Sequence, residues 1–167
     1  MVHPSSILGR GTKNIMKQKF IEAYMKTAET FAELSSAKRL HVGALVVKDD
    51  RIISIGYNGM PSGWDNDCEF REYTLGGLAG YLDEDGSSYN LKTKPEVLHA
   101  ETNAIAKLAK STESGDGATM FITHAPCLDC AKLIYQSGIS NVLYRNSYRD
   151  TAGLDFLSKA GLTVTQV

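Results

Sequence analysis

Apolar side chains recur at steps of three and four residues in the first regular segment of the chain, which we expect to begin at Asn14. The stripe consists of Phe20, Tyr24, Ala28, Phe31 and Leu34. Lysine and glutamate occupy the opposite face, so the pattern predicts an amphipathic helix that buries one side. The polar stretch SSAKR ends it.

Two β-branched apolar runs follow this helix. VGALVV covers 42–47 and IISIGY covers 52–57, and KDDR separates them. Two short runs of this kind around a polar turn predict a β-hairpin.

Strand and helix patterns alternate in the second half of the chain. In order they are the helix VLHAETNAIAKLAK, the strand ATMFITH, the helix PCLDCAKLIYQSG, the strand ISNVLYR, the helix TAGLDFLSKAG and the strand LTVTQV. Pro126 suits the first turn of its helix and Gly138 the end. The alternation predicts one α/β domain over 1–167, with a mixed five-stranded sheet between helices on both faces in three α-β-α layers.

Two segments show no periodicity. Residues 1–13 form a polar lead-in, and residues 59–95 form a long polar loop or insertion. A loop of this length inside a compact domain is usually functional or disordered. Its middle part, GGLAGYLDEDGSSYN, is equally well explained as a solvated insertion.

Composition excludes several classes of protein. The chain has 167 residues, a formal net charge of −1 and three cysteines. A protein that binds a polynucleotide usually has more basic than acidic residues, so we expect no polynucleotide partner. Three cysteines do not make a disulfide scaffold, which indicates a reducing compartment. No signal peptide is apparent and no apolar run has the length of a membrane span, so we expect a cytoplasmic protein.

Two short motifs concentrate the chemistry of the chain. HAE contains His99 and Glu101, and PCLDC contains Cys127 and Cys130. The two cysteines are three residues apart on one helical face, and both motifs open a helix, whose N-terminus favours the thiolate that metal binding needs. Either motif alone is weak evidence, because C-x-x-C also occurs in redox proteins. Together they predict a zinc site.

The number of ligands decides what kind of site this is. One histidine and two cysteines leave zinc one protein ligand short of a closed structural site, and catalytic sites keep that position for water. Other candidates for a fourth ligand are Cys68, His41, His124 and His3, for which packing or solvated positions are the simpler explanation. We therefore predict one catalytic zinc per chain, with Glu101 taking a proton from the water and handing it to a leaving group.

The pattern H-x-E…P-C-x-x-C is the signature of zinc nucleobase deaminases. With VGALVV, GYNGMPSG, APCLDCAKLIYQSGI and the YR at 148–149, the chain resembles the deoxycytidylate (dCMP) deaminase branch of the cytidine deaminase superfamily over roughly residues 15–167. The resemblance implies a cytidine-deaminase-like fold. It also implies hydrolytic deamination of dCMP at C4 to dUMP and ammonia, which supplies dUMP for dTMP synthesis.

The resemblance also implies how substrate is held. Asn58 would contact the sugar, although a turn residue with positive φ is the alternative. Lys38, Arg39, Tyr148 and Arg149 would hold the 5′-phosphate, with ordinary surface exposure as the alternative for each.

Members of this branch are often homohexamers, activated by dCTP and inhibited by dTTP bound with Mg²⁺ near the GYNGMPSG loop. The matching regulatory candidates in this chain are Asn58, Gly59, Gly63, Asp65 and Asp67. The glycine-rich, acidic stretch between Arg71 and Pro95 departs from many members of this branch.

Two other functions fit parts of the pattern. The first is a deaminase of another cytosine or adenine nucleoside, or of a base within a polynucleotide, and turnover of dCMP, deoxycytidine and a short single strand would separate them. The second is a zinc-stabilised interaction module without activity. That module would have a closed site with four ligands and no use for Glu101.

Overall fold

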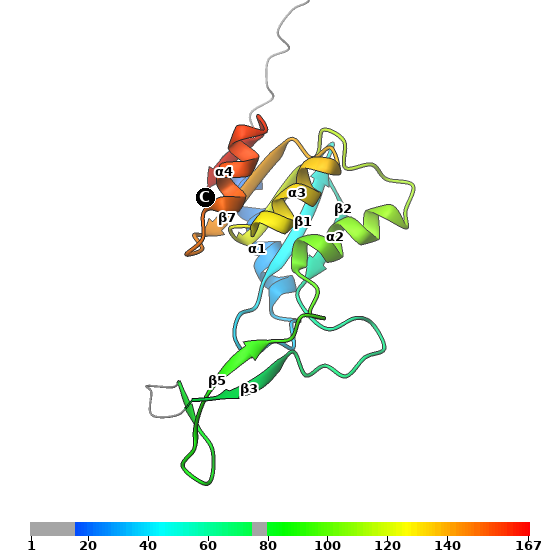
Figure 1. Cartoon of the computed structure of the whole chain (residues 1–167). Coiled ribbons are helices and arrows are strands. Elements are labelled where there is room, and N and C mark those ends of the chain that lie inside the picture. The colour runs from blue at the N-terminus through cyan, green and yellow to red at the C-terminus, as the bar shows by residue number, and fades with distance from the viewer. Residues whose placement is uncertain (1–15, 75–79) are drawn as a thin grey trace, which may run out of the picture.

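The computed structural model describes residues 16–74 and 80–167 (Figure 1). Its elements are, in chain order, α1 Gln18–Ala32, β1 Gly43–Lys48, β2 Arg51–Tyr57, β3 Glu69–Tyr73, β4 Tyr81–Leu82, β5 Ser88–Thr93, α2 Ala100–Ala109, β6 Thr119–His124, α3 Leu128–Gln136, β7 Asn141–Asn146, α4 Ala152–Lys159 and β8 Thr163–Gln166. The lead-in at 1–13 and the expected helix start at Asn14 lie outside the described residues.

Five strands form the central sheet, in the order β2-β1-β6-β7-β8. β1 runs antiparallel to both β2 and β6, whereas β6, β7 and β8 are parallel to one another. The predicted mixed five-stranded sheet is therefore confirmed. A parallel connection needs a crossover, and α3 and α4 provide the two crossovers of the second half.

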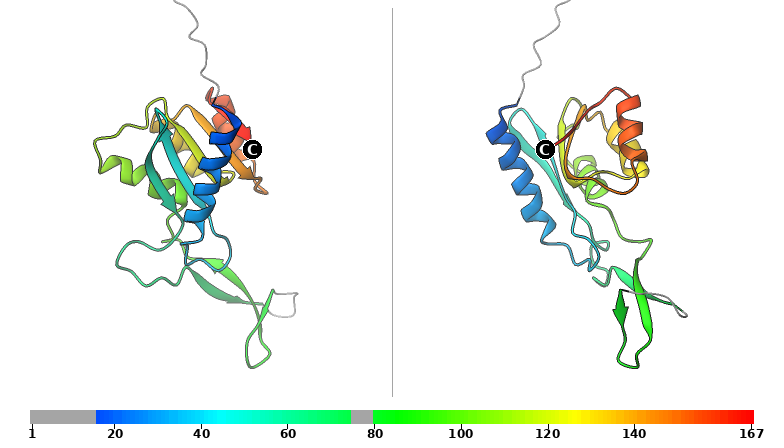
Figure 2. Two further views of the ribbon diagram at one scale, coloured as in Figure 1. Left: turned by 180° about the vertical axis from the view of Figure 1, so that it is seen from behind. Right: turned by 90° about the vertical axis from the view of Figure 1, so that its left-hand side faces the viewer.

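Helices cover both faces of this sheet, as the right-hand view of Figure 2 shows. Alternate residues of β1 point to opposite faces. Ala44 and Val46 pack in a core with residues of α2, α3 and α4, while Leu45 and Val47 pack with Met25 and Ala28 of α1. The predicted α-β-α layering is thus confirmed, and we call these three layers the main body.

The buried face of α1 agrees with the predicted stripe in part, since Tyr24, Ala28 and Phe31 pack in or against the core. Met25, Ala28 and Ala32 are its buried residues, whereas Phe20 is 42% exposed and Leu34, beyond the end of the helix, is 57% exposed. The reason is a close approach between helix and sheet. A Cβ added to Gly43 would lie 2.0 Å from the carbonyl oxygen of Ala28, so small residues mark the contact.

Residues 59–95, in which we expected no regular element, contain a second sheet. β3, β5 and β4 pair antiparallel in that order and project from the main body (Figure 1). We call this the projecting sheet. The rings of Tyr81 and Tyr89 stack with centroids 5.5 Å apart, and the Arg71 guanidinium lies over Tyr89. Such cross-strand contacts stabilise a sheet that has no thick core.

A second close approach sets the position of α2. A Cβ on Gly56 would lie 2.1 Å from the carbonyl oxygen of Ala100, so glycine lets the start of α2 rest directly on β2. The residues at that start carry the predicted chemistry. None of the helices in the described ranges is long and apolar enough to cross a membrane.

Candidate active site

The two predicted motifs meet at one edge of the central sheet. His99 is the N-cap of α2, and Cys127 is the N-cap of α3, which follows β6. Leu98, just before His99, forms two backbone hydrogen bonds with Gly59, which lies two residues after the end of β2. The Leu98 N–H donates to the Gly59 carbonyl (2.9 Å), and the Gly59 N–H donates to the Leu98 carbonyl (3.1 Å). Segments distant in the sequence therefore bring both helix N-termini together.

His99, Cys127 and Cys130 have the spacing of a zinc site. Their ligand atoms lie within 4.8 Å of one another, and no other such group of three occurs among residues 16–74 and 80–167. The His99 Nδ1 atom is 3.6 Å from Cys127 Sγ and 3.3 Å from Cys130 Sγ. Tetrahedral zinc, with bonds of about 2.3 Å to sulfur and about 2.1 Å to nitrogen, separates such atoms by about 3.6 Å. The side chains fit the metal.

Electrostatics at the helix ends favours metal binding. Hydrogen bonding to Cys130 and His99 lowers the pKa of the Cys127 thiol to about 4. Its thiolate and burial raise the pKa of the Cys130 thiol, so one proton stays in the pair. A metal ion that displaces this proton gains two thiolate ligands.

Glu101 lies in the first turn of α2, two residues after His99, and is 4% exposed. Burial raises the pKa of its carboxyl to about 7. A divalent cation at the neighbouring trio would favour the ionised form, so the two influences oppose each other. Such a carboxyl can both accept and release a proton near neutral pH.

The trio opens into a cavity of about 300 Å³, which we call the main cavity. His99, Cys127 and Glu101 form part of its wall. Further polar side chains in the wall belong to Arg39, Asn58, Glu69, Thr93, His124 and Tyr148. The cavity is therefore a polar pocket with the ligand candidates at one part of its wall.

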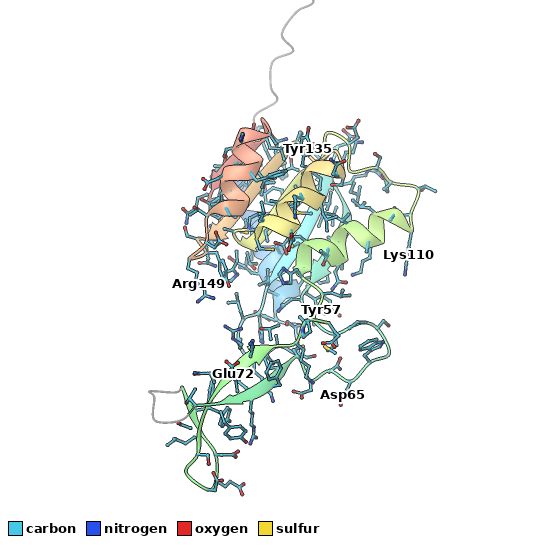
Figure 3. All side chains as sticks on the ribbon, viewed as in Figure 1. Tyr57, Asp65, Glu72, Lys110, Tyr135 and Arg149 are labelled. Carbon is cyan, nitrogen blue, oxygen red and sulfur yellow. The ribbon has the colours of Figure 1, made fainter. Side chains whose placement is uncertain are left out.

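The four predicted phosphate residues separate into two pairs. Arg39 and Tyr148 line the main cavity, and the Arg39 Nη1 atom donates a 3.0 Å hydrogen bond to Thr93 Oγ1. Lys38 does not line it and lies 3.8 Å from Asp67 on the surface. Arg149 is absent from the lining as well, and Figure 3 shows it at the periphery of the main body.

Asn58 lies in the cavity wall and ties two neighbouring segments together. Its Oδ1 accepts a 2.8 Å hydrogen bond from the Val42 backbone N–H, and its Nδ2 donates one of 2.8 Å to the Leu40 carbonyl. In the described ranges, the non-glycine residues with positive φ are Asp49 and Asp50, so Asn58 is not a left-handed turn residue. The amide keeps one N–H available for a ligand.

The other candidates for a fourth metal ligand lie elsewhere. Cys68 is buried against Ala37 and Val97. His41 makes a 2.7 Å hydrogen bond through Nε2 to the Ala37 carbonyl. His124 lines the main cavity, where burial lowers its pKa, but it is not part of the trio. His3 lies outside the described residues.

A second cavity of about 480 Å³ adjoins the first. Three regulatory candidates, Asn58, Gly59 and Gly63, line it, together with Lys107. Asp65 and Asp67 do not line it. Asp67 forms ion pairs with Lys94 and Lys38, and Figure 3 shows Asp65 on the loop that extends from the main body.

A histidine–dicysteine trio with an adjacent buried glutamate, on this three-layer fold, defines a metal site suited to activating water in a polar cavity. Sequence comparison places the chain more narrowly. Residues 18–146 match the family described as "Cytidine and deoxycytidylate deaminase zinc-binding region". The chain belongs to this cytidine and deoxycytidylate deaminase family.

Individual relatives point the same way. The deoxycytidylate deaminase of Saccharomyces cerevisiae is 36% identical over 153 residues, which are 91% of this chain and 46% of that protein. The chain thus spans about half the length of the yeast relative. The deoxycytidylate deaminase of Enterobacteria phage T4 is 34% identical over 75% of this chain and 78% of its own length.

A solved structure resembles the whole described body. The dCMP deaminase from cyanophage S-TIM5, in complex with dCMP and dUMP, has a TM-score of 0.77 and 48% sequence identity. The match covers 91% of this chain and 99% of that one.

Proposed function

We propose that the protein catalyses the hydrolysis of dCMP to dUMP and ammonia. The observation that carries this proposal is the position of Glu101, buried beside an open metal-ligand trio in a polar cavity. The names of the relatives supply the substrate class, since each of the three is a deaminase of deoxycytidylate. We further propose a single catalytic domain over 1–167.

His99, Cys127 and Cys130 would hold one zinc ion. Bound there, zinc would lower the pKa of a coordinated water towards neutrality. Two thiolates and an imidazole leave a coordination position free in a tetrahedral set, which distinguishes this site from a closed structural one.

Glu101 would carry the protons of the reaction. Its carboxylate accepts a proton from the attacking water and delivers it to N3 of the cytosine ring. It would then take the remaining proton from the hydroxyl added to C4 and pass it to the amino group, which leaves as ammonia while the C4 carbonyl of uracil forms. One residue can serve both steps because burial raises the pKa of its carboxyl while a neighbouring cation would lower it, so neither protonation state is strongly favoured by burial alone.

Asn58, Arg39 and Tyr148 would hold the sugar and the phosphate of the nucleotide. Asn58 lines the main cavity, and the N–H of its amide that is not bonded to Leu40 suits an oxygen of the sugar. The guanidinium of Arg39 and the hydroxyl of Tyr148 suit the 5′-phosphate. Lys38 and Arg149 would contribute only through their charge, at longer range.

An ultraviolet assay on the zinc-loaded protein tests the proposed function. The absorbance change on conversion of cytosine to uracil is followed with dCMP, deoxycytidine and a short single-stranded DNA. We expect dCMP to be converted with the highest kcat/KM. Equal turnover of deoxycytidine would contradict a nucleotide-specific site, and preference for the strand would identify a polynucleotide deaminase.

Removing the phosphate contacts is expected to weaken substrate binding. Arg39→Gln and Tyr148→Phe should each raise KM for dCMP by roughly 10- to 100-fold, because each loses a charge-assisted hydrogen bond of roughly 1.5–3 kcal/mol. Initial rates over a range of dCMP concentrations measure this change. Lys38→Gln is the matched control, since Lys38 lies next to Arg39 but outside the cavity lining; a KM change of equal size there would argue against a specific phosphate contact.

We also propose regulation through the second cavity. A deoxynucleoside triphosphate with Mg²⁺ would bind there, with dCTP activating and dTTP inhibiting, in a homohexamer located in the cytoplasm. Lys107 lies in the lining and offers a cation, although its Nζ now donates a 2.9 Å hydrogen bond to the Ile55 carbonyl. Of the two aspartates, Asp65 is the better candidate ligand for Mg²⁺, since Asp67 already forms ion pairs with Lys94 and Lys38.

Regulation has a direct kinetic expectation. Addition of dCTP should lower the dCMP concentration at half-maximal rate, and dTTP should raise it, because each effector would favour a different pre-existing form. Saturation curves with and without each effector measure the shift. A hyperbolic curve that neither effector changes would refute the proposal.

A further inference from the structure

Glu69, the first residue of β3, is a buried carboxylate in the wall of the main cavity and is 4% exposed. Its Oε1 atom accepts hydrogen bonds from the backbone N–H groups of Lys38 (2.9 Å) and Arg39 (3.2 Å). Within residues 16–74 and 80–167, its other oxygen, Oε2, is buried without a hydrogen-bond partner. A buried acceptor left without a donor is costly, so a ligand donor that reached Oε2 from the cavity that Glu69 lines would be favourable.

The neighbours of Glu69 place it at the phosphate end of the cavity. It pairs with Thr93 across β3 and β5, and Thr93 receives the hydrogen bond of the Arg39 guanidinium. It is also held by the Arg39 backbone. Glu69 is not part of the trio of His99, Cys127 and Cys130.

The chemistry of a 2′-deoxynucleotide leaves one suitable donor. A carboxylate repels the phosphate oxygens, so it does not bind them. The amino group on C4 of the ring has to lie beside Glu101 for the reaction. The remaining donor is the 3′-hydroxyl of the sugar, whose carbon is separated from the phosphate-bearing C5′ by a single ring carbon.

We infer that Glu69 is a specificity-determining residue whose Oε2 accepts a hydrogen bond from the 3′-hydroxyl of the substrate. This inference rests on the proposed function. It has a consequence for substrate choice, because a phosphate on the 3′-oxygen would remove the donor and bring a negative charge against a buried carboxylate. The cavity therefore selects free nucleotides over nucleotides inside a strand.

Two substrates and two variants test this inference. The kcat/KM of the zinc-loaded protein is measured with dCMP and with 2′,3′-dideoxycytidine 5′-monophosphate, which lacks only the 3′-hydroxyl. The unmodified protein should prefer dCMP by about 10- to 100-fold, the range of one hydrogen bond to a charged group. In Glu69→Gln, the preference should fall to about threefold or less, because the amide keeps the bonds to Lys38 and Arg39 through its oxygen but loses the charge.

Glu72→Gln is the matched control. Glu72 lies on the same strand but is exposed and paired with Lys92, outside the cavity lining. Its preference for dCMP should stay as in the unmodified protein. Deoxycytidine 3′,5′-bisphosphate should be a poorer substrate than dCMP for the unmodified protein, and Glu69→Gln should narrow that difference.

A purely structural role of Glu69 gives a different result. In that case Glu69→Gln lowers kcat/KM equally for both substrates and leaves their ratio unchanged, which would overturn the inference. If Glu69→Gln does not fold, Glu69→Asp keeps the charge but withdraws it by one methylene, and its ratio should also fall. Failure of the proposed function looks different, since the unmodified protein would then not convert dCMP at all.

Discussion

Glu101→Gln is expected to lower kcat for dCMP by about 10²- to 10⁴-fold, the range of general acid–base catalysis, because the amide cannot take up and release the protons. Its shape and hydrogen-bonding oxygen remain, so zinc content and nucleotide binding should persist. Steady-state kinetics, elemental analysis and a calorimetric titration with dCMP measure the three quantities.

The control for this variant is Glu96→Gln. Glu96 is an exposed acid five residues before Glu101 and does not line the main cavity. It should keep normal turnover. Loss of zinc in Glu101→Gln would identify Glu101 as a ligand, and near-normal turnover would place the proton transfer on another group.

The second large effect concerns the metal itself. The double variant Cys127→Ser, Cys130→Ser should lose stoichiometric zinc and all measurable dCMP deamination, because the two thiolates are two of the three protein ligands. Elemental analysis of the purified protein and the ultraviolet assay measure both. A chelator should inactivate the unmodified protein, and added zinc should restore it.

Cys68→Ala separates this site from the remaining cysteine. Cys68 packs with Ala37 and Val97 and does not belong to the trio, so the variant should retain one zinc per chain. Full zinc occupancy in the double serine variant would show that the metal is held elsewhere. The melting temperature of the double serine variant should fall as its zinc is lost, because a ligand that binds only the folded chain stabilises it.

The metal trio and Glu101 were predictable from sequence because their geometry is local. A histidine at a helix cap fixes the direction of a residue two positions later, and two cysteines three positions apart share a helical face. The meeting of the two helix starts required only that strands and helices alternate. The mixed five-stranded sheet and its layering followed from the same alternation, whereas the strand order was not predicted.

Contacts that depend on strand register were not predictable in the same way. Glu69 reaches the cavity because β3 pairs with β5 in one register, yet β3 is exposed beyond Glu69 and shows no alternation of apolar side chains, and no residue of β5 is fully buried. For α1, the predicted stripe contained Ala28 correctly, but its end members Phe20 and Leu34 are exposed. The actual contact was set by Ala28 and Gly43, whose small size allows the backbones to touch.

Among the predicted phosphate residues, sequence could not separate Arg39 from Lys38. Adjacent residues in an irregular segment point in different directions, and the choice between them came from distant partners. Thr93 holds the Arg39 guanidinium over the cavity, while Asp67 draws Lys38 to the surface. Both partners come from the 59–95 region, for which sequence predicted no regular structure.

Asn58 belongs to the walls of both cavities and is hydrogen-bonded to the backbone of Leu40 and Val42, just before the start of β1. A ligand in one cavity that shifts this amide therefore changes the free energy of a ligand in the other. Thermodynamic reciprocity then applies: whatever factor a triphosphate imposes on the affinity for a non-reacting dCMP analogue, the analogue must impose on the triphosphate. The dCMP concentration would thus change the affinity of the protein for its effector. Titration of the triphosphate with and without the analogue, and of the analogue with and without the triphosphate, must give the same coupling free energy.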